Sequence, residues 1–282
     1  MYIFLLCLRS GLARDTLVGV KRYLFQIKMS KHIIAVLNQK GGVGKTTTAI
    51  NLAAYLKKDG RKVLICDIDP QGNSTGGLGI NKQTVSPTLY DVLFFRAHGL
   101  EAVQKNTGRG FDILPANSQL AAAEVELVGL PQREFQLKKV LDSLDYDIIL
   151  IDCPPSLGLL SVNALTAAGD VLVPVQAEYY ALEGLGQLLD VVSQVRTALN
   201  PSLNLLGIIL TMYDSRNALS DSVKSELTRH FSDRVFETVI PRNVRLAEAP
   251  SFGRTIAEHD RWSKGARAYK ALAKELEKKL YG

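Results

Sequence analysis

The sequence predicts an α/β fold in which a doubly wound, mostly parallel sheet carries helices on both faces. Short apolar runs alternate with helix-length amphipathic segments, as is typical of strands that are buried on both faces of a parallel sheet. A glycine-rich turn separates the first apolar run from the first helical segment. Two later runs end in aspartate, at the strand ends where open α/β sheets place their ligands.

Seven runs rich in Ile, Val and Leu are the candidate strands. They are residues 33–37, 63–68, 111–114, 147–151, 171–175, 205–210 and 235–240. The candidate helices are the amphipathic segments 46–58, 132–144, 157–168, 184–199, 217–231 and 264–280. No internal repeat, low-complexity tract or long linker interrupts this alternation, so we expect a single domain over residues 29–282.

Length and composition exclude several classes of protein. The chain has 282 residues with 46% hydrophobic content, which is enough to bury one sizeable core. No apolar run reaches the roughly 18 residues of a membrane-spanning helix, so we expect a soluble protein. Cys7, Cys66 and Cys153 lie far apart without a C-x-x-C spacing, which argues against a zinc site or a disulfide framework and fits a reducing cytoplasm.

Residues 1–28 are interpreted as an N-terminal extension outside the domain. Their apolar start, residues 1–8, has no preceding basic region and no convincing small-residue cleavage site, unlike a signal peptide. Met29 stands directly before the first strong strand. Either an upstream start codon or a family-specific extension would explain the segment.

The basic charge of the domain is concentrated toward its C-terminal end. Residues 1–28 hold five Lys and Arg against one Asp, so much of the formal net charge of +6 lies outside the domain. From Arg216 onward there are 14 Lys and Arg against nine Asp and Glu. This distribution favours a nucleic-acid partner more than the overall charge does.

The glycine-rich turn after the first strand is a phosphate-binding P-loop. It reads Lys40-Gly41-Gly42-Val43-Gly44-Lys45-Thr46-Thr47, and a helix follows. A strand, a glycine-rich turn and a helix N-terminus in this order place backbone N–H groups and the helix dipole around phosphates. Lys45 is expected to reach the β- and γ-phosphates of ATP, and the Thr46 hydroxyl is expected to bind Mg²⁺.

The loop departs from the strict pattern G-x-x-x-x-G-K-[ST], because Gln39 occupies the position of the first glycine. A second lysine, Lys40, follows Gln39. An exposed loop lysine is normally only solvated, but a lysine at the mouth of a phosphate-binding turn is positioned to meet phosphate charge. We interpret the motif as the deviant, two-lysine form of the P-loop.

Three aspartates stand at the ends of two predicted strands. Asp67 and Asp69 stand at the end of the second run, where a carboxylate can position an attacking water or the water shell of a metal. Asp152 follows four apolar residues in the Walker B arrangement, so we expect it to bind Mg²⁺ through water. The alternative is that these acids only terminate strands and cap a helix, but their spacing from the P-loop favours a site.

These motifs resemble those of the ParA/Soj chromosome- and plasmid-partitioning ATPases, in the wider family that includes MinD and nitrogenase iron protein. The resemblance covers the chain from Lys31 to the C-terminus and implies the P-loop NTPase fold. Beyond the P-loop it extends to the segments at residues 67–73, 151–158, 174–184 and 239–253. The last two segments are typical of the Soj branch.

The resemblance implies a role for each site residue. Lys40 corresponds to the signature lysine that reaches the phosphates of the second subunit in an ATP-sandwiched homodimer. Asp69 corresponds to the acid implicated in hydrolysis, so we assign it the water-orienting role and give Asp67 a supporting one. Pro241 and Asn243 correspond to positions near the adenine. The expected catalytic residues are Lys40, Lys45 and Asp69.

The resemblance also implies a slow, ATP-driven switch. ATP would join two subunits, the dimer would bind double-stranded DNA of the nucleoid without sequence preference, and a ParB-like protein would stimulate hydrolysis and release. Arg216 and Arg245 correspond to arginines implicated in the DNA contact. Arginine suits phosphate contacts because its guanidinium donates several hydrogen bonds and stays charged, and such binding weakens with salt.

Related functions fit the sequence less well. A MinD-like ATPase needs a bulky, basic membrane helix, whereas segment 264–280 has a narrow, Ala-rich apolar face, so we expect it to pack against the domain without stable membrane association. A nitrogenase-type reductase needs paired cluster-ligating cysteines, and a tyrosine kinase needs a C-terminal tyrosine cluster; Cys153 and Tyr281 stand without such partners. An ATP-gated DNA-binding regulator, for which hydrolysis matters little, stays open as an alternative.

Overall fold

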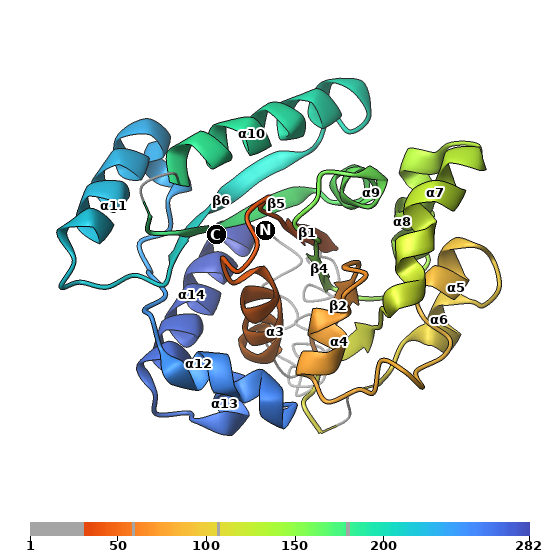
Figure 1. Cartoon of the computed structure of the whole chain (residues 1–282), viewed down its shortest axis with the longest axis horizontal. Coiled ribbons are helices and arrows are strands. Elements are labelled where there is room, and N and C mark those ends of the chain that lie inside the picture. The colour runs from red at the N-terminus through yellow and green to blue at the C-terminus, as the bar shows by residue number, and fades with distance from the viewer. Residues whose placement is uncertain (1–30, 58–59, 106–107, 179–180) are drawn as a thin grey trace, which may run out of the picture. The chain divides into compact units, whose positions relative to one another are not determined.

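Six parallel strands form one sheet in the order β3-β2-β4-β1-β5-β6 (Figure 1). They are β1 (His32–Val36), β2 (Val63–Asp67), β3 (Asp112–Leu114), β4 (Ile148–Asp152), β5 (Asp170–Gln176) and β6 (Asn204–Thr211). The computed structural model describes residues 31–57, 60–105, 108–178 and 181–282, so the predicted extension, residues 1–28, lies outside the described residues. The predicted doubly wound α/β fold is confirmed.

Helices cover both faces of the sheet. The longer ones are α3 (Lys45–Leu56), α8 (Gln136–Asp142), α9 (Leu159–Ala167), α10 (Ala181–Ala198), α11 (Ala218–Phe231) and α14 (Lys264–Tyr281). The short ones are α4 (Asn73–Gly77), α5 (Leu89–Leu93), α6 (Gly99–Ala102), α7 (Ala123–Glu126), α12 (Val244–Glu248) and α13 (Ile256–His259). Figure 1 shows α9 and α10 on one face of the sheet and α3 and α14 on the other.

Alternate residues of β1 enter hydrophobic cores on opposite faces of the sheet. Ile33 and Ala35 belong to the core that includes α9 and α10, whereas Ile34 belongs to the core that includes α3 and α14. Strands β2 and β4 are buried along their whole lengths. Because helices cover both faces, these strands read as continuous apolar runs in the sequence.

Helix α14 packs its apolar stripe against α3, as predicted. Tyr269, Leu272 and Leu276 are fully buried. The Tyr269 hydroxyl lies 3.1 Å from the hydroxyl of Thr48, which joins the C-terminal helix to the helix that follows the P-loop. In the part of the chain that the structure describes, no helix has the length and apolarity needed to cross a bilayer.

The seventh predicted strand, residues 235–240, does not form. The segment runs beside β6 and forms isolated bridges at Val235 and Pro241. The N–H groups of Phe236 and Ile240 also donate to carbonyls of β6, at 2.9 and 2.8 Å, but no continuous ladder results. Between them, the backbone N–H groups of Glu237 and Thr238 donate to the carboxylate of Glu275 on α14, at 2.7 and 3.0 Å. The apolar pattern arose because residues such as Phe236 are buried in the core, and burial alone does not create a ladder of backbone hydrogen bonds.

Two predicted helices are shorter than expected. The helix predicted over 132–144 begins as a regular α-helix only at Gln136, after a 3-10 turn at Arg133–Phe135. Gln132 has a positive φ of 51°, which prevents the helix from continuing toward the N-terminus. The helix predicted over 157–168 begins at Leu159, because Gly158 has an extended backbone. The end of the helix predicted over 46–58 lies outside the described residues.

Replacing Gly207 with alanine is expected to lower the free energy of unfolding by about 1–3 kcal/mol. A Cβ at this position of β6 would lie 2.6 Å from the Phe236 ring and 2.7 Å from the carbonyl oxygen of Arg234. The matched control is Gly186→Ala in α10, where a Cβ meets nothing within 4 Å. This change should raise the free energy of unfolding by about 0.5–1 kcal/mol, because alanine favours helix. Urea denaturation followed by circular dichroism measures both, and equal stability of the two variants would contradict the packing described.

Candidate nucleotide-binding site

The P-loop leaves β1 through Asn38, which fixes the start of the turn. Its side-chain amide donates to the carbonyl of Pro174 at 2.7 Å, and its side-chain oxygen accepts from the N–H of Lys40 at 3.0 Å. Gly42 and Gly44 then take positive φ values of 76° and 91°. Glycine adopts this conformation without steric cost, so the sequence permits the tight turn into α3.

The turn encloses open space at the N-terminus of α3. A Cβ added at Gly41 or Gly42 would meet nothing within 4 Å. Gly44 caps the helix without a side-chain hydrogen bond, so the first N–H groups of α3 have no capping side chain. The first N–H groups of a helix have no partner within the helix, and together with the positive end of the helix dipole they make this space suited to phosphate. Val43 lies just before α3, and Thr46 and Thr47 lie in its first turn.

Lys45 is buried inside the turn, with its ammonium group donating to the carbonyl of Lys40 at 3.1 Å. Burial lowers the pKa of Lys45, and the nearby carboxylates of Asp152 and Asp69 oppose this change. The predicted phosphate-binding lysine is therefore held in place by the loop backbone. A buried cation next to open space attracts an anion strongly, because little water screens it.

The side chain of Lys40 is half-exposed. It forms an ion pair with Glu178, whose carboxylate also accepts a hydrogen bond from Gln176. Sequence reasoning gave Glu178 no role, although it lies in the 174–184 segment that carries the resemblance. Tyr179 and Tyr180 of that segment lie outside the described residues.

Asp152 ends β4 and offers a free carboxylate oxygen to the site. Its Oδ2 accepts from the hydroxyl of Ser74 at 2.7 Å, while its Oδ1 is buried without a hydrogen-bond partner among the described residues. Burial raises the pKa of Asp152 to about 6, against the lowering effect of the Ser74 and Thr46 hydroxyls. A buried carboxylate oxygen next to a threonine hydroxyl is the donor set that Mg²⁺ prefers, so the predicted pair Thr46 and Asp152 fits this ion.

No second group of metal-binding side chains was found in the part of the chain that the structure describes. The described ranges of the chain contain no cluster of three or more His, Cys, Asp and Glu side chains that could hold a metal. Mg²⁺ is commonly held by one or two protein oxygens together with water and substrate phosphates.

Asp67 is fully buried at the end of β2 and supports the neighbouring backbone. Its Oδ2 accepts from the N–H and hydroxyl of Thr75 at 2.8 and 2.7 Å, and its Oδ1 accepts from the N–H of Asp69 at 3.2 Å. Burial raises the pKa of Asp67 to about 8, and the charge of Asp152 adds to this effect. These contacts hold the backbone at the start of α4, and the nucleotide-binding and supporting role expected of Asp67 stays a prediction.

Asp69 lies in the turn between β2 and α4 and is buried. Its Oδ1 accepts from the N–H of Gln71 at 2.9 Å, and its carbonyl accepts from the N–H of Gly72 at 2.8 Å. The side chain is 6% exposed. The turn orients the carboxylate before any ligand binds, which suits a residue predicted to orient water.

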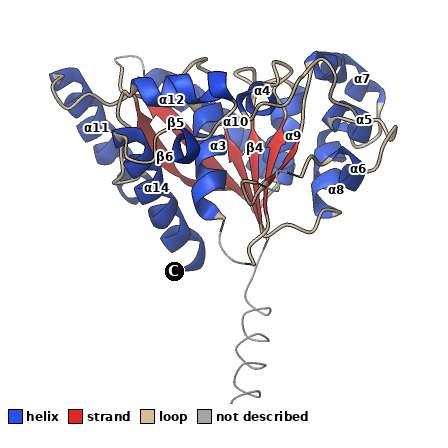
Figure 2. Ribbon diagram, turned by 90° about the horizontal axis from the view of Figure 1, so that it is seen from below, coloured by secondary structure: helices blue, strands red, loops and turns tan. Residues whose placement is uncertain are grey.

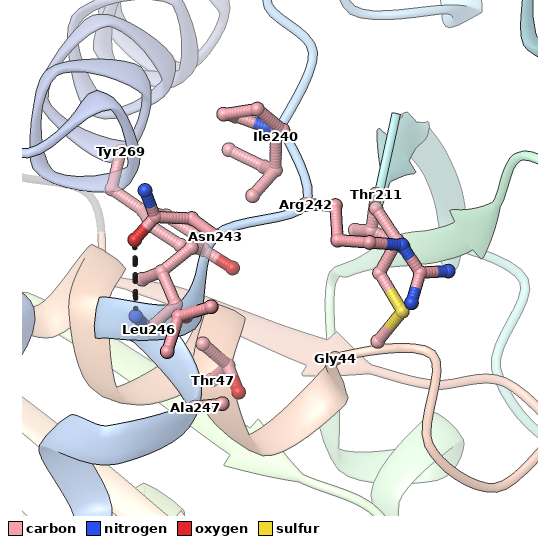
Figure 3. A pocket seen from close by; sticks show the side chains of 12 residues that line it. Gly44, Thr47, Thr211, Ile240, Arg242, Asn243, Leu246, Ala247 and Tyr269 are labelled. Atoms are coloured by element: carbon pink, nitrogen blue, oxygen red, sulfur yellow. Dashed lines mark hydrogen bonds between the residues drawn. The ribbon is translucent and has the colours of Figure 1, made fainter. Parts of the chain in front are cut away.

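A cavity of about 350 Å³ opens beside the P-loop (Figure 3). Pro241 and Asn243, predicted to lie near adenine, are both in its lining. The side chain of Asn243 caps α12 by accepting from the N–H of Leu246 at 3.2 Å, which fixes its orientation. The remaining lining residues are Gly44, Thr47, Thr211, Met212, Ile240, Arg242, Val244, Leu246, Ala247 and Tyr269.

The two arginines predicted to contact DNA lie on the surface, each beside an acid. Arg216 is 88% exposed and donates twice to Asp214, at 2.9 and 3.0 Å. This contact lowers the pKa of Asp214 to about 2. Arg245 on α12 pairs with Glu248 at 2.9 Å and lies 3.7 Å from Asp260.

Several residues that build the site were missed in the sequence. Ser74 and Thr75 belong to α4, which has five residues and is too short to give a periodic pattern. Tyr269 was predicted to pack and does so, but it also lines the cavity. The position of Ser74 just after the Asp67–Asn73 segment was a usable signal, because strand ends hold ligand-binding residues.

Comparison with known proteins identifies close relatives. A family model for an AAA domain matches residues 31–205. The sporulation initiation inhibitor protein Soj of Bacillus subtilis (strain 168) is 53% identical over 246 residues, which cover 86% of this chain and 97% of that protein. The chromosome-partitioning ATPase Soj of Thermus thermophilus is 54% identical over 243 residues, which cover 86% of this chain and 94% of that protein.

A solved structure shares the fold over most of its length. It is described as cobyrinic acid a,c-diamide synthase from Mycobacterium smegmatis with bound ATP analogue and magnesium. The two chains are 40% identical with a TM-score of 0.76, and the match covers 87% of this chain and 93% of the other.

The stability of the nucleotide-free protein is expected to fall as the pH rises from about 6 to about 8. Asp67 titrates at about 8 in the folded protein, whereas an unfolded aspartate titrates near about 3.9. Between these values the folded state holds a proton that the unfolded chain has released, so a rise in pH favours unfolding. We expect a loss of about 1–2 kcal/mol, measured by urea denaturation with a chelator present.

The variant Asp67→Asn should flatten this dependence, because it removes the titrating group. Asp142→Asn on the exposed side of α8 is the matched control and should keep the wild-type slope. A wild-type stability that rises over this range, or equal slopes for wild type and Asp67→Asn, would contradict the assignment.

Proposed function

The chain belongs to the Soj/ParA family of chromosome-partitioning ATPases, and from this premise we propose that it is an ATP-driven DNA-segregation switch. In this proposal ATP joins two subunits, the dimer binds double-stranded DNA without sequence preference, and slow, partner-stimulated hydrolysis releases it. The observation that carries the proposal is the open phosphate cradle of the P-loop, bordered by the buried Lys45 and by the free Oδ1 of Asp152.

ATP fits the cradle and the cavity together. The phosphates would occupy the open space at Gly41 and Gly42, and the base would occupy the cavity lined by Pro241 and Asn243. Gly44 belongs to both, so one nucleotide can fill them without a gap. The ATP analogue and magnesium bound to the Mycobacterium smegmatis protein support this assignment.

The side chains around the cradle divide the chemistry between them. When bound, Mg²⁺ would neutralise phosphate charge, with Thr46 and Asp152 as its protein ligands. Lys45 would hold the β- and γ-phosphates, and Asp69 would orient the attacking water from the turn before α4. Phosphoryl transfer depends mostly on positioning and charge stabilisation, and these side chains are of the types that supply both.

The surface around the nucleotide supports an ATP-dependent homodimer. Figure 2 shows α4, α7 and α12 at the same edge of the sheet. Exposed apolar side chains on α7, on α12 and in the segments after α12 include Val125, Val244, Phe252 and Trp262, at 76%, 70%, 62% and 75% exposure. Lys40 is half-exposed and can reach a second subunit once its ion pair with Glu178 opens.

The DNA contact is proposed for the surface that carries Arg216 and Arg245. Both guanidinium groups are exposed, and their pairing with acids on the surface is weak because water and salt screen it. DNA phosphates can therefore replace the acids at little cost, and release of counterions from DNA favours the exchange. In this proposal the protein is cytoplasmic and nucleoid-associated, and it acts with a ParB-like partner.

A membrane role of the MinD kind is less well supported. The apolar stripe of α14 is buried against α3, with Tyr269, Leu272 and Leu276 in the core. A membrane-binding helix would need such a stripe to be exposed.

The variant Asp69→Ala is expected to lower the kcat of ATP hydrolysis at least about 100-fold while ATP affinity changes by less than about threefold. The reason is that Asp69 is proposed to act on the water and not on the bound nucleotide. Phosphate release and equilibrium binding of a fluorescent ATP analogue measure the two quantities. Asp142→Ala, an exposed aspartate on α8, is the control. Hydrolysis at the wild-type rate would contradict the catalytic role of Asp69. Normal DNA segregation by a variant that does not hydrolyse ATP would favour the alternative, an ATP-gated DNA-binding regulator.

Sedimentation with nonspecific duplex DNA tests the switch directly. With ATP and Mg²⁺ the wild type should bind DNA as a dimer at low salt and release it at high salt, and ADP should not support binding. Arg216→Ala and Arg245→Ala should each weaken binding about 3- to 10-fold while dimers still form.

Arg133→Ala is the matched control for the arginine variants, because Arg133 is also exposed and paired with an acid, Glu134, at 2.9 Å. Its DNA affinity should equal that of the wild type. ATP-dependent dimers without affinity for DNA would refute the DNA role, and anionic liposomes would then test the MinD-like alternative.

A further inference from the structure

One strained residue lies in the wall of the base cavity. Among the residues that the structure describes, four non-glycine positions have a positive φ: Phe95, Gln132, Met212 and Ser232. Met212, with φ of 51°, is the one of these four that lines the cavity beside the P-loop. Side chains rarely adopt this conformation, because the Cβ lies too close to the backbone.

Hydrogen bonds on both sides hold Met212 in this conformation. Before it, the Thr211 hydroxyl donates to the carbonyl of Val43 in the P-loop at 2.8 Å. After it, the N–H of Tyr213 donates to Ile240 at 3.0 Å, and the carbonyl of Tyr213 accepts from Arg242 at 3.1 Å. The backbone of Met212 is thus fixed between the phosphate loop and the segment that carries Pro241.

The need to end β6 does not explain a methionine here. Glycine or asparagine would make the same turn with less strain. Strained residues persist where the surroundings enforce them, and they are concentrated at binding sites. The side chain of Met212 is half-buried in the cavity, so what distinguishes methionine from glycine at this position is what it presents to a ligand.

We propose that Met212 contacts the face of the nucleotide base and makes the site prefer purine over pyrimidine nucleoside triphosphates. The inference rests on the proposed nucleotide site. The thioether is polarizable and makes favourable contacts with aromatic rings. Figure 3 shows Leu246 and Tyr269 across the cavity from Thr211, and Met212 follows Thr211 in the chain. A base would therefore lie between two apolar walls, and a purine covers more of both than a pyrimidine.

The variants Met212→Gly and Met212→Leu test this role. Met212→Gly relieves the strain and removes the contact, so it should weaken ATP binding about 5- to 10-fold but UTP binding by less than about twofold. Met212→Leu keeps an apolar side chain of similar size and should lose less than about threefold for ATP. Calorimetry with Mg²⁺ measures both, and inorganic tripolyphosphate, which has no base, should bind all variants equally.

Gln132→Gly is the matched control, because Gln132 has the same φ of 51° but is exposed and outside the cavity lining. It should bind both nucleotides like the wild type. The thermal midpoints of both glycine variants should not fall.

Two results would overturn the proposal. One is an unchanged ATP affinity in Met212→Gly; the other is an equal loss for ATP, UTP and tripolyphosphate, which would indicate a structural role. In either case, if the wild type still binds ATP more tightly than UTP, the proposed nucleotide site stands. If the wild type bound neither nucleotide, both this inference and the proposed function would fail.

Discussion

The register of the central strands is the constraint on which the site depends. Asp67 at the end of β2 lies directly beside Asp152 at the end of β4, and Val36 at the end of β1 lies on the other side of Asp152. This alignment places Asp152 next to Asp67 and near the buried Lys45, at the carboxyl edge of the sheet. A buried charge is costly unless it is paired, so a slip of one residue between β1 and β4 would separate Asp152 from Lys45 and leave a charge without its partner.

The two aspartates differ because their surroundings differ. Asp67 accepts hydrogen bonds from Thr75 and Asp69, which makes it the support of α4. Asp152 keeps Oδ1 free beside Lys45, which stabilises its charged form. One strand end therefore anchors the backbone, while its neighbour is left available for a cation that arrives with phosphate.

The parts of the fold that follow from local patterns could be predicted, and the parts that follow from contacts distant in the sequence could not. The six strands and the P-loop are encoded by apolar runs and glycine spacing within short segments. The false strand over 235–240 depends on Glu275, which no local pattern connects to it. The free Oδ1 of Asp152 and the strained backbone of Met212 could not be predicted either. Both depend on hydrogen bonds between residues that are distant in the sequence and meet only in the folded protein.

The arrangement of the cavity suggests how nucleotide and DNA could be coupled. The phosphate chemistry lies in the part of the chain that the AAA-domain model matches, residues 31–205, whereas most of the wall of the base cavity follows it. Both arginines proposed for DNA lie close to that wall in the chain: Arg216 follows the end of β6, and Arg245 belongs to α12. A nucleotide that fills the cavity contacts both segments and can fix their positions together. Because ATP and ADP carry the same base, the base contacts alone cannot distinguish them, and a ligand shifts an equilibrium only through contacts that differ between two states. In the proposed switch, contacts of the γ-phosphate with the P-loop would supply that difference, and the base contacts would connect it to the segments that carry the two arginines.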